Sequence, residues 1–367
     1  EDAELVAEEF NNSYQIFEPG EDERDYDASI DAHRQRVPYG QYRAKRLMQY
    51  TLKGYPTYQG ELVEARTFLE QALQAFRAEG NRRKEAMMLN NTGYLLREMG
   101  QLDEAEGYHL RSLEIRQDIG DRIGVGRVYG QLSALYSAQG RHAEASAAAE
   151  SAHQVAVETR DRLYEATALA QWAIAEAALG DRAAARQHHL QSRAVFEEIQ
   201  DRMRALQVDV QLARLDLEEQ SLDSAETLAL DTLEASRQAG FIQPEVEAME
   251  LLGDIALARG DSGAAITEFT AALERVRESS WSGKEVDILI RLVNVHLDAG
   301  DVASAAPLTG ELAGHEATLA SLKARARFAR ARGENGQAVA LMEEAKSLAG
   351  EAWDANNEAL LGEYRGH

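Results

Sequence analysis

The chain has 367 residues, a formal net charge of −24 and a sequence pI near 4.8, and it contains no cysteine. A surface this acidic is repelled by nucleic acid and by anionic membranes, and the lack of cysteine excludes disulfides and thiolate metal sites. No apolar run reaches the roughly 18 residues of a membrane span, so we expect no membrane insertion and a cytoplasmic location. Because the chain begins at Glu1 without methionine, the sequence leaves open whether a leader or a further domain precedes it.

The first 60 residues divide into an acidic and a basic segment. Residues 1–31 carry twelve Asp or Glu against a single Arg, whereas residues 32–60 carry no acid and have basic residues among five tyrosines. Charge blocks of this kind are typical of solvated chain, which makes 1–31 a partly disordered acidic arm. The alternative is that this N-terminal arm docks on the basic, Tyr-rich surface of its own chain. A degenerate first helix, interrupted by Gly54 and Pro56, completes the second segment.

From residue 61 onward a motif recurs with a period of 40 residues. GQLDEAE at residues 100–106 has counterparts such as GELVEAR from Gly60 and GRHAEAS from Gly140. A fixed period of this size predicts a solenoid, in which each unit packs only on its neighbours. One small residue is in phase with each copy of the motif, and the set is Ala65, Ala105, Ala145, Ala185, Ala225, Ala265, Ala305 and Ala338.

Turn signals also fall halfway between the copies, so each unit is expected to be a hairpin of two helices of about four turns each. Inside the intervals apolar residues recur at i, i+3, i+4 and i+7, and strand alternation is absent. Short polar side chains stand where helix N-caps are needed, at Asn81, Asp121, Asp161, Asp201, Asp261 and Asp301. Small residues in the first helix of successive units predict close helix contacts, at Gly93, Ser133, Ala173, Ala213 and Gly253.

These residues resemble the tetratricopeptide repeat family, whose small residues and turn glycine correspond to Gly93, Gly100, Ala105 and Ser112. The 40-residue unit is similar to the variety in kinesin light chains, Leu-Gly-Asn polarity adaptors and sensor arrays of bacterial signal-transduction ATPases. The resemblance implies an all-α fold, a right-handed α-solenoid (superhelix) of about eight helix-turn-helix hairpins. The repeat array would span 61–348, with a shortened last unit, and 349–367 would form a C-terminal capping helix and tail.

Motifs for chemistry are missing from the sequence. No phosphate-binding loop occurs, and the glycines at 120–126 have no preceding strand. His188 and His189 are adjacent and so lie on different sides of a helix, while His315 lacks the second His of a zinc helix. We therefore expect no enzyme activity, no catalytic residue, no cofactor and no metal site.

The resemblance instead implies a binding surface on the concave side of the superhelix, formed by the first helix of each hairpin. Carrying over the family's positions gives a peptide-binding groove that is basic at one end, apolar in the middle and acidic further along. The acidic strip is expected to be unpaired, ready for Lys or Arg of a partner. The groove residues are Asn90, Tyr94, Arg97, Arg127, Ile174, Arg214, Glu247, Glu250, Asp254, Asp287 and Asn294.

The sequence therefore predicts a non-catalytic scaffold that holds a protein or peptide partner in this groove. The ligand expected has a cationic end, an apolar anchor in the middle, and an acidic group opposite Arg97 and Arg127. The alternative is the ligand-sensing array of a larger bacterial regulator, such as a signal-transduction ATPase, a kinase or a transcriptional activator.

Overall fold

A computed structural model describes residues 59–279, 282–315, 317–350 and 353–366. The acidic arm and nearly all of the basic Tyr-rich segment lie outside these residues. The described residues form 16 helices and contain no strand. Within them, every helix is too short or too polar to cross a membrane. The helices are α4 (Gln59–Ala78), α5 (Arg82–Glu98), α6 (Leu102–Asp118), α7 (Arg122–Ala138), α8 (His142–Thr159), α9 (Arg162–Leu179), α10 (Arg182–Glu198), α11 (Arg202–Glu218), α12 (Leu222–Ala239), α13 (Ile242–Ala258), α14 (Ser262–Ser279), α15 (Ser282–Asp298), α16 (Val302–Leu312), α17 (Leu319–Ala331), α18 (Asn335–Ala349) and α19 (Ala355–Arg365).

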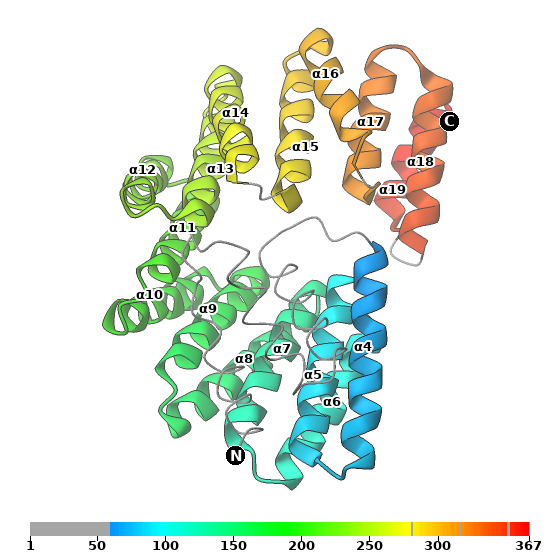
Figure 1. Cartoon of the computed structure of the whole chain (residues 1–367). Coiled ribbons are helices and arrows are strands. Elements are labelled where there is room, and N and C mark those ends of the chain that lie inside the picture. The colour runs from blue at the N-terminus through cyan, green and yellow to red at the C-terminus, as the bar shows by residue number, and fades with distance from the viewer. Residues whose placement is uncertain (1–58, 280–281, 316, 351–352, 367) are drawn as a thin grey trace, which may run out of the picture.

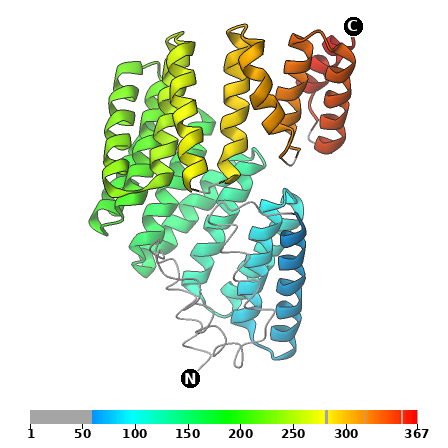
Figure 2. The same cartoon turned by 45° about the horizontal axis from the view of Figure 1, so that its top comes forward.

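The helices form a right-handed α-solenoid, as the repeats predict. After α4, each odd-numbered helix pairs with the even-numbered helix that follows it, and the hairpins stack side by side (Figure 1). Odd-numbered helices of adjacent hairpins contact one another, as α5 does with α7 and α11 with α13. They therefore lie on the inner side of the curve, and the even-numbered helices lie on its outer side. Figure 2 shows the array as an open arc with α4 and α19 at its two ends.

Turns and caps fall where the sequence places them. Most helices end at a glycine with positive φ, such as Gly100 at 74° and Gly180 at 89°, a conformation that costs glycine little. Three turns have other residues there, with φ of 58° at Arg160, 60° at Gln200 and 61° at Gln220. The predicted N-caps are confirmed. In each case the side-chain oxygen of the cap accepts a hydrogen bond from the backbone N–H three residues later, in the first turn of the helix, at Asn81, Asp121, Asp161, Asp201, Asp261 and Asp301.

Small residues bring the two helices of each hairpin together. All eight alanines in phase with the motif are buried. The positions 16 residues apart in facing helices also match in size. A Cβ on Gly93 would lie 2.8 Å from the ring of His109, and a Cβ on Gly253 would lie 2.4 Å from the ring of Phe269. In the hairpin of α11 and α12, alanines occupy both of the corresponding positions, 213 and 229, and both are buried.

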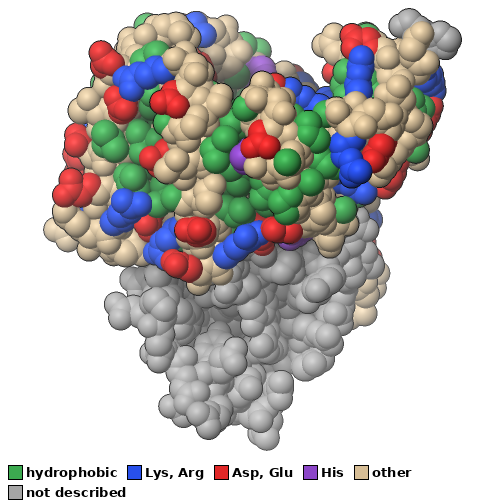
Figure 3. Space-filling view, turned by 90° about the horizontal axis from the view of Figure 1, so that it is seen from above, with side chains coloured by type: hydrophobic (Ala, Val, Ile, Leu, Met, Phe, Trp, Pro, Cys, Tyr) green, Lys and Arg blue, Asp and Glu red, His purple; other side chains and the backbone are tan. Residues whose placement is uncertain are grey.

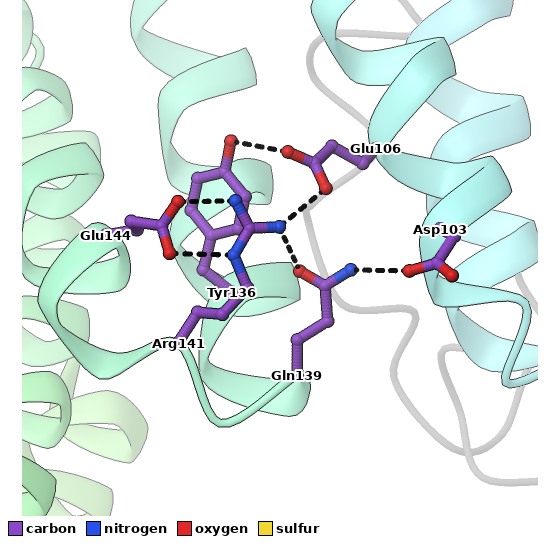
Figure 4. A network of polar contacts seen from close by, with 6 residues as sticks. All are labelled: Asp103, Glu106, Tyr136, Gln139, Arg141 and Glu144. Atoms are coloured by element: carbon purple, nitrogen blue, oxygen red, sulfur yellow. Dashed lines mark hydrogen bonds and ion pairs between the residues drawn. The ribbon is translucent and has the colours of Figure 1, made fainter. Parts of the chain in front are cut away.

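Polar side chains join one hairpin to the next along the edge of the array. Arg141, at the start of α8, donates to Glu106 of α6 at 2.6 Å, and Tyr136 of α7 donates to the same carboxylate at 3.1 Å (Figure 4). The Arg141 guanidinium also lies over the Tyr136 ring, 4.3 Å from its centre. Gln139 extends the network to Asp103 at 3.3 Å. These bonds from Arg141 keep the pKa of Glu106 below its usual range, despite partial burial.

The C-terminal end departs from the regular period. Helix α16 has 11 residues with Pro307 inside it, and α17 has 13. The expected capping helix is α19, whose Leu361 is buried in one cluster with Leu322 and Met342. This helix covers the apolar side of α17 and α18 that would otherwise face water, as a terminal cap of a repeat array does.

The size matching between positions 253 and 269 can be tested by a double-mutant cycle. Gly253→Ala should lower the free energy of unfolding by about 1–3 kcal/mol, because its Cβ would overlap the Phe269 ring. In a Phe269→Ala background the same change should cost far less, since it recreates the alanine pair at 213 and 229. Urea unfolding measures both values. Equal costs in the two backgrounds would show that the helices do not approach as described.

Candidate functional site

The predicted groove residues all lie on odd-numbered helices, α5 to α15. Five of them, together with Ala134, form a series with one residue per helix and a 40-residue spacing, here called the inner row: Tyr94, Ala134, Ile174, Arg214, Asp254 and Asn294. Contacts between neighbouring odd-numbered helices follow this row. Arg214 Nη1 lies 3.8 Å from Asp254 Oδ2, and Arg127 lies over the ring of Tyr164, 4.9 Å from its centre. These contacts join α11 to α13 on the row and α7 to α9 beside it.

The acidic strip is not unpaired, and that expectation is wrong. Glu250 is only 2% exposed, and its carboxylate lies 3.1 Å from Lys284 Nζ and 3.5 Å from Arg291 Nε. Asp254 pairs with Arg291 and lies within reach of Arg214. Asp287 is exposed and lies 3.8 Å from Lys284. Three carboxylates of the strip thus share three cations, which leaves this part of the surface close to neutral.

Lys284 and Arg291 were missed because they occupy positions of α15 outside the set carried over from the family. The sequence shows that both residues are cationic. Only the arrangement of α15 beside α13 shows that they reach Glu250 and Asp254. Glu247 has another partner, since Gln243 donates its amide to it at 3.0 Å. Burial raises the pKa of Glu247. Its carboxylate therefore ionises less readily than a free one.

Other groove residues also have partners within the chain. The Arg97 guanidinium lies 4.9 Å from the centre of the Tyr94 ring and 2.9 Å from Glu98. Asn294 accepts a hydrogen bond from Arg327 of α17 at 3.1 Å. Ile174 differs, because 46% of it is exposed on α9. It is the large apolar side chain that the inner row offers to a partner.

Asn90 connects the groove to a buried histidine. Its Oδ1 lies 3.0 Å from Nδ1 of His109, which is fully buried in the hairpin behind it. Burial, together with the charge of Arg97, lowers the pKa of His109 to about 3. His189, at the same register 80 residues later, has its pKa lowered to about 4 by burial and by the charges of His188 and Arg186. Both rings are neutral at pH 7.

Charges of both signs mix on the surface. Figure 3 shows acidic and basic side chains interspersed around exposed apolar ones on the face seen from above. Among the described residues, no group of three His, Cys, Asp or Glu could hold a metal ion. The inner row therefore offers shape, one apolar contact and paired charges.

A family model described as tetratricopeptide repeat matches residues 55–118 and 84–158. This part of the chain carries tetratricopeptide repeats. The hairpins beyond residue 158 continue the same 40-residue unit with the same turn and core positions. No curated protein sequence matches the chain.

Solved structures share this tetratricopeptide fold at low identity. BtubC (BKLC) from P. vanneervenii is 19% identical with a TM-score of 0.51, over 59% of this chain and 91% of that one. A Rap protein complexed with competence and sporulation factor is 14% identical with a TM-score of 0.56, over 80% and 76%. The STAND protein PH0952 from Pyrococcus horikoshii, which has a tetratricopeptide repeat sensor, is 12% identical with a TM-score of 0.53. The match covers 88% of this chain and 53% of PH0952.

The pH dependence of stability should reveal the buried His109. A histidine whose pKa is lowered by folding supports stability above pH 6.5, and that support is lost as the pH falls toward its folded value. His109→Phe reproduces the natural pair of Gly253 and Phe269. At pH 5 the variant should lose about 2 kcal/mol less than the parent, each relative to its own value at pH 8. Parallel curves of unfolding free energy against pH would contradict a neutral, buried His109.

Proposed function

We propose that the chain is a non-catalytic scaffold that holds a protein or peptide partner along the inner row. The observation that carries this proposal is the recurrence of that position on six odd-numbered helices, with Ile174 exposed near the middle of the row. An exposed large apolar side chain flanked by polar groups is a common anchor point for a partner. The Rap protein, whose solved structure contains competence and sporulation factor, has the same fold and supports a binding role.

The partner's chemistry follows from the paired charges. Because Lys284, Arg291 and Arg214 already neutralise much of the acidic strip, a cationic partner gains less there than the sequence suggested. The apolar anchor against Ile174 then contributes most of the affinity, and the charges set the orientation. We propose a segment with an apolar side chain for Ile174 and with Lys or Arg toward Asp287, which is exposed.

Two matched variants test the location of the site. Ile174→Asp places a charge on the inner row, whereas Leu190→Asp places one on α10, an outer helix, at a similar exposure of 49%. We expect proteins retained from the native lysate by the parent chain to be lost with Ile174→Asp and kept with Leu190→Asp. Quantitative mass spectrometry of the retained fraction measures this, and thermal unfolding shows that both variants fold. Equal retention by the two variants would place binding away from the inner row.

Unfolding measurements test the buried ion pairs of Glu250. Glu250→Ala leaves Lys284 and Arg291 without their buried acceptor, so we expect the free energy of unfolding to fall by about 1–3 kcal/mol. Asp287→Ala removes an exposed carboxylate and should change stability by less than about 0.5 kcal/mol. Denaturant unfolding of the two variants compares these costs. A negligible cost for Glu250→Ala would show that this carboxylate is solvated, as the sequence suggested.

A second candidate function is the sensor array of a larger bacterial regulator. The likeness to PH0952 favours it, because that signal-transduction ATPase has its tetratricopeptide repeats as a sensor. The sequence of the complete gene separates the two candidates. A nucleotide-binding or DNA-binding region encoded upstream of Glu1 supports the sensor, and its absence supports the scaffold.

A further inference from the structure

The contact between α10 and α11 holds a charged pair at two positions that are apolar in several other hairpins. Where an even-numbered helix meets the next odd-numbered one, residues 16 positions apart form an apolar layer at several contacts, as Leu73 with Leu89, Leu233 with Met249, and Leu273 with Leu289. At the α10 to α11 contact the same two positions hold Arg193 and Asp209. A charged pair therefore replaces a pair of core residues at this one place in the array.

Asp209 is a buried acceptor. It is 5% exposed, and Arg193 Nε lies 2.8 Å from its Oδ1. The guanidinium is out of line for a hydrogen bond, and Oδ1 accepts none from the described part of the chain. Burial raises the pKa of Asp209 to about 6, against the opposing charge of Arg193. A buried oxygen that is ion-paired but accepts no hydrogen bond can still take a donor, so a ligand that donates to it is favoured.

An open surface pocket of about 450 Å³ adjoins this carboxylate. It exists because Ala205 stands where other hairpins have a glutamate, such as Glu165 and Glu245, which fills the space and pairs with arginine. Its apolar wall is Leu206 with two alanines. The lining residues are Arg193, Glu197, Gln200, Arg202, Ala205, Leu206, Asp209 and Ala235.

Arg202 lacks the partner that its counterparts have. At the same register, Arg122 pairs with Glu158 and Arg162 pairs with Glu198, each at the end of the second helix of its hairpin. The residue that would pair with Arg202 is Gln238. Among the described residues, Arg202 makes no ion pair, and it stands exposed at the rim of the pocket.

We propose that this pocket binds a small zwitterion, an amino acid or dipeptide with an aliphatic side chain. Its ammonium group would donate to Asp209, its carboxylate would pair with Arg202, and its side chain would lie on Leu206. The pocket holds two cationic and two anionic side chains, so a ligand of a single charge would leave one sign unmatched. Glu197, 3.5 Å from Arg193 Nη2, offsets the guanidinium that would otherwise repel the ammonium group.

Titration calorimetry with the complete chain tests the proposal, with L-leucine and L-leucyl-L-leucine as probes. At least one of them should bind saturably, and L-leucinamide and N-acetyl-L-leucine, which lack one of the two charges, should bind about 10-fold more weakly or not at all. If neither probe binds up to 10 mM, or if the derivatives bind as well as the parent compound, the proposal is wrong.

Variants place the binding in this pocket. Gln238→Glu lies outside the pocket and restores the missing ion pair, so it should weaken binding by engaging Arg202. Asp209→Leu introduces the residue found at positions 89, 169 and 289, and it should abolish binding while raising the melting temperature at pH 8. Arg162→Gln, at the equivalent position of the preceding hairpin, is the control and should leave binding unchanged. Binding that survives both Gln238→Glu and Asp209→Leu would overturn the assignment to this pocket.

Discussion

The close approach of the two helices in each hairpin is the contact on which the whole array depends. It requires a small residue early in the second helix and a matched pair of sizes 16 residues apart, and the period of 40 repeats that requirement along the chain. Hairpins of the same thickness can stack with a constant rotation, which gives a regular superhelix. The inner row arises because this stacking keeps one position of the odd-numbered helices from α5 to α15 on the same side.

Most of this fold is predictable from local features. The positive φ at Gly100 and its counterparts, the caps such as Asp121, and the buried alanines such as Ala145 each depend on interactions within one hairpin or across one turn. Such interactions leave a signature at a fixed place in the repeat, so the sequence alone locates them. The turns at Arg160, Gln200 and Gln220 show that the phase survives even where the usual glycine is replaced.

The chemistry of the inner row was less predictable, for a physical reason. The sequence shows that Glu250 and Asp254 share one side of α13, but not which cations of α15 reach that side. Ion pairs of long side chains between hairpins depend on rotamers and on the rotation between units, and neither is encoded in the spacing. The pocket beside Asp209 could not be predicted for the same reason. Aligning the hairpins shows only that position 209 holds aspartate where other hairpins have a core leucine.

The contact between α10 and α11 combines an apolar cluster with a buried charged pair. Val195 and Phe196 pack with Val208 and Leu212 there, and Arg193 meets Asp209 beside an open pocket. If the two ends of the array were pulled apart, each contact would bear the same tension. An occupant of the pocket beside Asp209 would touch both α10 and α11, so it would add resistance to extension at this one junction.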